Sequence, residues 1–231
     1  LKAVELHQQV LEQDPGYADA YITVGSYNYV MGSLPFFFKL LAALGGHHGS
    51  RAEGLRQLRL VTERGRDAKD DGRVALLTFL ARERNWKEML PQLEQLASRY
   101  PQNFIFRMEH AQVLLRLGKS IEAARLIEAL LADPAAAGQA DLIHFSYGET
   151  LLETGQAQTA LAHFQAAGRL PSAAADLTVL SRLRAGQALD LLGRRAEAIV
   201  EYRQVLSRQD VYDSKELAEK YLKKPYRREQ P

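Results

Sequence analysis

Two adjacent histidines, His47 and His48, are the residues of this chain best suited to chemistry. Neighbouring imidazoles can share a metal ion, but a protein metal site normally needs a third or fourth ligand nearby. No aspartate or further histidine lies close to the pair in the sequence, and the chain has no cysteine at all. We therefore expect no metal site and no cofactor. The other four histidines fall in predicted helices, where packing or surface roles suffice.

Motifs for catalysis are also missing. The segment 45–49 is glycine-rich, yet no Lys-Ser or Lys-Thr pair follows it and no strand precedes it, so it does not match a P-loop. Neither Gly-x-Ser-x-Gly nor His-Glu-x-x-His occurs, and the lack of cysteine excludes disulfides and a thiolate nucleophile. The many carboxylates lie in helical patterns, where they usually form a solvated face. The sequence predicts that the protein is not an enzyme.

Charge gives little attraction toward nucleic acid or anionic membranes, because 30 basic residues are balanced by 28 acidic ones. The exceptions are a basic run and a basic tail: Arg64, Arg66 and Lys69, then Lys220, Lys223, Lys224, Arg227 and Arg228. Acidic neighbours offset them at Asp67, Asp70, Asp71 and Glu219. Only Tyr221 and Tyr226 could stack on bases. We prefer a solvated surface, with nucleic-acid binding as the alternative.

The elements that must position these residues are helices. Ala, Leu, Arg, Glu and Gln are abundant and strong β-formers are sparse. Prolines end the periodic apolar windows at four places, Pro15, Pro101, Pro134 and Pro171. The sequence predicts an all-α fold.

Three stretches share one spacing: a small residue, a glycine seven positions later and an alanine five positions after that. They are Ala111–Gly118–Ala123, Gly148–Gly155–Ala160 and Gly186–Gly193–Ala198. Small residues let two antiparallel helices approach closely, and the glycine turns the chain between them. Leu77 and Met89 occupy the equivalent places in a less typical hairpin. Large residues four positions after the second-helix site are expected to pack into the next hairpin: Leu58, Leu93, Ile127, Phe164 and Tyr202.

This pattern resembles the tetratricopeptide repeat (TPR) family, most clearly over Ala160–Pro171. The resemblance implies a right-handed superhelical solenoid of TPR-like helical hairpins, whose first helices line a concave groove that binds a protein or peptide. We expect a single solenoid over residues 1–231. Its parts are an orphan second helix (1–15), a hairpin (17–66) with an insertion (33–49), hairpins at 70–101, 104–134, 141–171 and 179–208, and a C-terminal capping helix (213–224). Because a lone second helix would expose its apolar face, the natural protein is expected to extend upstream.

The insertion contains the most hydrophobic run, Leu34–Leu44, which is too short to span a bilayer. The preferred interpretation is a longer first helix, broken at Pro35, whose apolar face packs on its neighbours. The alternative is an exposed patch at Phe36, Phe37 and Phe38 that serves self-association, a partner or a membrane surface. With Lys39 as its single charge, this patch would suit a protein better than a membrane. Residues 17–60 also resemble the extended TPR proteins of the TTC39 and Iml2 type.

The TPR resemblance also implies which residues face the groove. These candidate binding residues are Tyr29, Thr78, Arg82, Met108, Gln112, Arg116, Phe145, Glu149, Glu153 and Gln187, with Asp190 at the end of the series. The lysine, asparagine and arginine pattern that grips chaperone C-termini is not present. Because Arg82 and Arg116 give way to acidic residues, we expect a partner segment that is acidic toward the N-terminal half.

The sequence thus favours a non-catalytic scaffold for protein–protein interaction, with a bacterial cell-envelope or assembly factor as one form of it. The alternative is a self-association module or a membrane-surface adaptor that acts through residues 34–44. We expect a soluble protein of the cytoplasm or periplasm, with no nucleic-acid partner and with homo-oligomers as an option.

Overall fold

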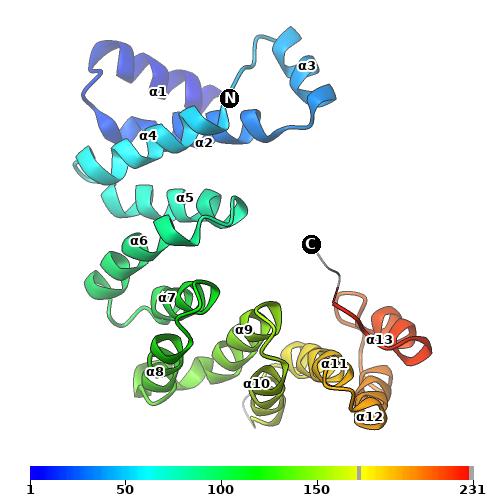
Figure 1. Ribbon diagram of the computed structural model, residues 1–231. Coiled ribbons are helices and arrows are strands. Elements are labelled where there is room, and N and C mark those ends of the chain that lie inside the picture. The colour runs from blue at the N-terminus through cyan, green and yellow to red at the C-terminus, as the bar shows by residue number, and fades with distance from the viewer. Residues whose placement is uncertain (171–172, 229–231) are drawn as a thin grey trace. The chain divides into compact units, whose positions relative to one another are not determined.

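The computed structural model describes residues 1–170 and 173–228, which form helices joined by short turns, with no strand among them (Figure 1). The chain divides into two compact units, residues 1–96 (unit 1) and residues 97–231 (unit 2), and each is described by itself. The α-helices are α1 (Lys2–Gln13), α2 (Tyr21–Ser33), α3 (Phe36–Leu44), α4 (Arg51–Arg64), α5 (Lys69–Arg82), α6 (Trp86–Arg99), α7 (Phe104–Arg116), α8 (Ser120–Leu131), α9 (Ala140–Glu153), α10 (Ala157–Arg169), α11 (Ala175–Leu191), α12 (Arg195–Leu206) and α13 (Ser214–Lys223).

Helices pack as hairpins of the TPR type in the pairs α2 with α4, α7 with α8, α9 with α10 and α11 with α12, so the predicted all-α fold of TPR-like hairpins is confirmed. Short 3₁₀ turns precede α2 and α9, at Ala18–Ala20 and Pro134–Gln139. Pro171, the expected end of the fourth hairpin, lies outside the described residues. That the hairpins form one continuous solenoid stays a prediction. No helix of the described chain has both the length and the apolar character needed to cross a membrane.

Close helix crossings depend on small residues at the points where the two helices of a hairpin meet. In unit 1, a Cβ on Gly54 would lie 2.5 Å from the backbone oxygen of Gly25, so α2 and α4 touch through their backbones. In unit 2, a Cβ on Gly148 would lie 2.8 Å from the Phe164 ring, and one on Gly186 would lie 2.5 Å from the Tyr202 ring. Phe164 also lines a cleft with Ser181 and Ala185 of α11, and the Tyr202 ring lies 5.7 Å from that of Tyr221 on α13, so both also meet the next element, as expected. Each in addition fills the gap that the glycine of its own hairpin leaves.

The predicted glycine turns follow the first helices of three hairpins. Gly118, Gly155 and Gly193 have φ angles of +79°, +88° and +73°, in the left-handed region where glycine has no steric penalty. The next amide bonds back into the helix, as when Lys119 N–H donates to the Leu114 carbonyl at 2.9 Å. This is the Schellman arrangement, which satisfies the last carbonyls of a helix. In the second hairpin, Arg84 occupies the equivalent place with a φ of +53°.

The insertion in unit 1 forms a helix of its own. Helix α2 ends at Ser33, and Pro35 precedes α3, which contains no buried residue. The expected break at Pro35 is thus present, but the preferred interpretation of a helix packed on its neighbours is wrong. Phe36, Phe37 and Phe38 are 84%, 63% and 57% exposed.

Candidate partner-binding pocket

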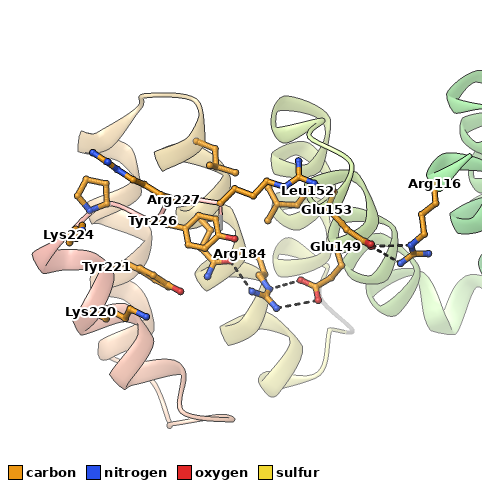
Figure 2. Close-up of a pocket in the computed structure, with 14 residues that line it drawn as sticks. Arg116, Glu149, Leu152, Glu153, Arg184, Lys220, Tyr221, Lys224, Tyr226 and Arg227 are labelled. Carbon is orange, nitrogen blue, oxygen red and sulfur yellow. Dashed lines mark hydrogen bonds and ion pairs between the residues drawn. The ribbon is translucent and has the colours of Figure 1, made fainter. Parts of the chain in front are cut away.

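Unit 2 contains an open pocket of about 780 Å³ between its first helices and its C-terminal segment (Figure 2). Helices α9 and α11 form one part of its wall, and α13 with the residues that follow it forms another. The lining residues are Arg116, Glu149, Leu152, Glu153, Arg184, Gln187, Leu191, Lys220, Tyr221, Lys224, Pro225, Tyr226, Arg227 and Arg228. The TPR-like stacking brings the helices together, and the capping helix closes one side.

Two ion pairs neutralise the part of the pocket formed by the first helices. Arg116 Nη2 lies 2.9 Å from Glu153 Oε2, and Arg184 Nε lies 2.5 Å from Glu149 Oε1. Figure 2 shows both arginines reaching across to the carboxylates of α9. Arg184 also donates to Gln187 Oε1 at 2.9 Å, which fixes its orientation. These four charges therefore hold one another in place and cancel in net charge.

The C-terminal side of the pocket is strongly basic. Six basic and two acidic side chains line the pocket, so the described lining has a surplus of four positive charges. Lys220 and Lys224 come from the end of α13, and Arg227 and Arg228 follow it. All four residues are exposed. Arg228 also donates to the backbone oxygen of Glu153, which ties the tail to the end of α9.

Aromatic rings line the same side. The rings of Tyr221 and Tyr226 meet edge to face with their centroids 5.3 Å apart, and Tyr221 also lies 5.7 Å from the ring of Tyr202. Lys220 Nζ lies 5.7 Å from the centre of the Tyr221 ring. Both pocket tyrosines are half-buried. The surface thus combines cationic groups with flat apolar faces, a combination that suits both charge and side-chain recognition.

A buried carboxylate positions the C-terminal side. The side chain of Asp190 on α11 is fully buried and accepts from Tyr202 Oη at 2.9 Å, from the Tyr226 backbone N–H at 2.8 Å and from Arg195 at 3.0 Å. Arg195 also donates to the backbone oxygens of Tyr221 and Leu222, each at 2.8 Å. Burial and the bond to Asp190 raise the pKa of the Tyr202 phenol far above its usual value, so it remains a donor. We call Asp190, Arg195, Tyr202 and Tyr226 the tail anchor.

Several residues predicted to face the groove do meet in this pocket: Arg116, Glu149, Glu153 and Gln187. We expected the groove to change from basic at Arg116 to acidic at Glu153. These two side chains form an ion pair, so their charges neutralise each other at this point. Gln187 is almost fully buried and offers the pocket only an edge. Asp190 does not face a ligand, because it is buried in the tail anchor.

The other predicted groove residues lie elsewhere. Met108 and Gln112 are buried in α7, and Phe145 is half-buried with its ring 5.9 Å from that of Phe164. In unit 1, Tyr29 is buried and donates to Glu83 at 2.8 Å, while Thr78 and Arg82 are exposed on α5. Phe36, Phe37 and Phe38 belong to α3 of unit 1.

Sequence reasoning missed the location of the basic residues. The tail from Lys220 to Arg228 was recognised as a cluster, but nothing in its local pattern shows that it folds back onto α9 and α11. Arg184 was also missed, although it lies one turn from Gln187 on α11 and shares its wall of the pocket. The signal for Arg184 was its distance of three residues from a predicted groove position.

Groups suited to catalysis or metal binding do not gather in the described residues. No cluster of three or more His, Cys, Asp or Glu side chains is present among them. His144 and His163 approach to 3.0 Å between their Nδ1 atoms, in partly buried positions on α9 and α10. Burial, together with the neighbouring His144, lowers the pKa of His163 to about 4. Burial also lowers the pKa of His144, so both imidazoles favour the neutral form, and their rings pack between the two helices.

Comparison with solved structures identifies MamA as a similar fold. MamA from Desulfovibrio magneticus RS-1 (residues 41 to the end) is 16% identical, with a TM-score of 0.49, and the match covers 74% of this chain and 92% of that one. A MamA RS-1 ArsTM double mutant is 18% identical, with a TM-score of 0.48 and the same coverage of each chain. No family model matches the chain, and no curated protein does. The assignment to a TPR-type fold rests on the hairpins described above.

Proposed function

We propose that this protein is a non-catalytic interaction scaffold, whose unit 2 pocket binds an acidic, extended segment of a protein partner. The observation that carries the proposal is the surplus of four positive charges beside Tyr221 and Tyr226, in a pocket of about 780 Å³. An extended peptide fits an open pocket of this size better than a folded surface does, and its carboxylates would replace water beside the lysines.

Charge would set both the choice of partner and the speed of binding. Arg116 and Arg184 already hold carboxylates of α9, so a ligand would meet mainly Lys220, Lys224 and Arg227. Exposed charges of this kind speed the encounter and reject basic partners more than they add affinity. The faces of Tyr221 and Tyr226 would supply the apolar contact that charges alone lack.

The test is a titration with a labelled peptide of alternating Glu-Ala and Asp-Ala pairs, beside the same peptide carrying Gln and Asn. We expect the acidic peptide to bind and its affinity to fall as salt is raised, because screening weakens exposed charge pairs. Lys220→Glu combined with Lys224→Glu should weaken binding roughly tenfold, since both charges face the ligand.

The matched control is Lys2→Glu with Lys87→Glu, which makes the same charge change at exposed sites of unit 1. This variant should bind like the unchanged protein. Equal binding of the acidic and amide peptides, or an unaltered affinity in the Lys220 and Lys224 variant, would show that the pocket does not recognise acidic segments.

The similarity of residues 17–60 to the TTC39 and Iml2 type remains part of this proposal. Its support is the arrangement of α2, the Leu34-Pro35 break, the apolar α3 and the Gly45-Gly46 pair, in that order. None of these features enters the argument for the acidic-peptide pocket.

A further inference from the structure

Helix α3 of unit 1 exposes its large apolar residues to solvent, whereas an ordinary surface helix buries them. At about 100° per residue, its six large apolar residues occupy an arc of about 200°, and the remaining arc holds Lys39, Ala42 and Ala43. The two alanines are half-buried, whereas all six large residues are exposed. These exposed residues, which we call the α3 patch, are Phe36, Phe37, Phe38, Leu40, Leu41 and Leu44, of which Phe36 and Leu40 also line a cleft beside the helix.

The fold holds this helix in place at both ends. A Cβ on Gly32 would lie 2.3 Å from the Arg51 backbone nitrogen, and one on Gly49 would lie 2.5 Å from Met31 Cβ. The segment therefore leaves α2 and enters α4 through a narrow neck that only glycine permits. Beyond the neck, α3 lies apart from α2 and α4 (Figure 1), over a cleft of about 300 Å³. The neck thus fixes an apolar helix outside the core of unit 1.

We propose that the α3 patch is the contact surface between two copies of this chain. The three phenylalanines together expose about two whole side chains, or roughly 400 Å². The leucines add nearly two further side chains, so the patch reaches roughly 700 Å², above what a monomer normally exposes. Two patches that cover most of this area on each other would bury roughly 1,200 Å², which is the lower end of the range for specific protein–protein interfaces.

Charge also favours a second copy over a membrane surface. Between Leu34 and Ser50, Lys39 is the only Lys, Arg, Asp or Glu, and it lies on the side of α3 opposite the patch. Two patches could therefore pair without the desolvation penalty of burying a charge. A helix that binds the membrane surface usually has a polar face rich in lysine and arginine, whereas here that face holds one lysine and two alanines.

The pairing has a natural geometry. In an antiparallel pair related by a two-fold axis, each copy presents the same patch to the other. Leu41 lies near the middle of α3 and near the centre of the patch arc, whereas Leu40 lines the cleft beside the helix, so the axis would pass beside Leu41. The two Leu41 side chains would then be the closest equivalent pair across the interface. Lys39 of each copy would point away from the axis.

The first experiment measures solution mass over a wide range of concentration. We expect a mass that rises toward that of a dimer, and at least a tenfold increase in the dimer dissociation constant on changing Phe37→Ser and Leu41→Ser together. The matched control is Ile121→Ser with Val200→Ser, which removes two exposed apolar side chains from unit 2 and should leave the mass unchanged. Both residues of the test pair are exposed, so circular dichroism should show an intact fold.

A second experiment tests the geometry. The chain has no cysteine, so L41C and K39C each introduce a single thiol. A short bis-maleimide should join two L41C chains efficiently and two K39C chains poorly. Equal joining of both variants, or a monomer at every concentration, would overturn the proposal. A monomer that sediments with vesicles of equal parts phosphatidylcholine and phosphatidylglycerol, and loses this with Phe37→Ser and Leu41→Ser, would assign the patch to a membrane instead. Peptide binding by unit 2 does not affect any of these results.

Discussion

Each unit has an exposed segment, α3 in unit 1 and the basic tail in unit 2, and the two segments are fixed by different kinds of contact. In unit 1, an apolar helix is fixed by a neck at Gly32 and Gly49, where the packing leaves no room for a Cβ atom. In unit 2, a basic tail is fixed by a buried carboxylate that accepts from a phenol, a guanidinium and a backbone amide. The difference follows from what each surface can offer. The apolar side chains of α3 form no hydrogen bonds, and its backbone groups bond within the helix, so contacts at its two ends fix it. An irregular tail instead has backbone groups that need hydrogen-bond partners outside the tail.

This contrast predicts different sensitivities. The tail anchor depends on a few polar groups in a buried place, where losing one partner leaves the others unsatisfied. The glycine neck depends on space, so it is sensitive to a single added methyl group. The first device should fail by loss of bonds and the second by steric clash.

Asp190→Ala should have the largest effect. It removes the acceptor of Tyr202, Arg195 and the Tyr226 amide. We expect the free energy of unfolding of unit 2 to fall by about 3 kcal/mol, as when a buried ion pair is broken. Urea unfolding followed by circular dichroism gives the change in free energy. Hydrogen exchange should show faster exchange in α13 and at Tyr226.

Asp190→Asn is the informative companion to this variant. It keeps the shape and an acceptor oxygen but loses the charge, so its cost should be smaller than that of the alanine change. If Asp190→Ala unfolds at the same urea concentration as the unchanged chain, the tail anchor does not stabilise unit 2, and the contrast between the units fails on that side.

Gly32→Ala tests the glycine neck. The new Cβ would lie 2.3 Å from the Arg51 backbone nitrogen and 2.6 Å from the Ser50 carbonyl carbon, and backbone atoms cannot rotate away. We expect a loss of about 1–3 kcal/mol, the usual cost of overpacking. The single tryptophan, Trp86, lies within unit 1, so its fluorescence during urea unfolding reports the change.

The control for the neck is Gly168→Ala on α10. There the added Cβ would lie 3.5 Å from its nearest neighbour, an ordinary contact, and alanine favours a helix. This change should be neutral or slightly stabilising. A Gly32→Ala protein as stable as the unchanged chain would mean that α2 and α4 are not held together at this point.

The sequence could predict the features that residues close together in the chain determine. The glycine turns and small helix-crossing residues repeat at fixed distances, because hydrogen bonding and close approach impose those residues locally. The same register assigned Arg116, Glu149 and Glu153 to first helices, and all three line the unit 2 pocket. The direction of the α3 patch could not be predicted, since an apolar period does not say whether its face points inward. The role of Asp190 was also hidden, because its partner Tyr226 lies 36 residues away.

The smallest change in stability is expected from substitutions at the hairpin turns, where the two units use different residues. Unit 2 places Gly118, Gly155 and Gly193 in the left-handed region, but unit 1 places Arg84 there, with a φ of +53°. A residue with a Cβ pays about 1–2 kcal/mol for this conformation, and glycine loses part of that gain through the greater freedom of its unfolded chain. Arg84→Gly should therefore stabilise unit 1 by about 0.5–1 kcal/mol, measured by Trp86 fluorescence in urea.

The reverse change, Gly118→Ala, should destabilise unit 2 by a similar amount. No atom lies within 4 Å of the added Cβ, so the cost comes only from the backbone conformation. If Arg84→Gly is instead destabilising, the arginine side chain contributes more to unit 1 than its strained backbone costs, and the two turns are not equivalent.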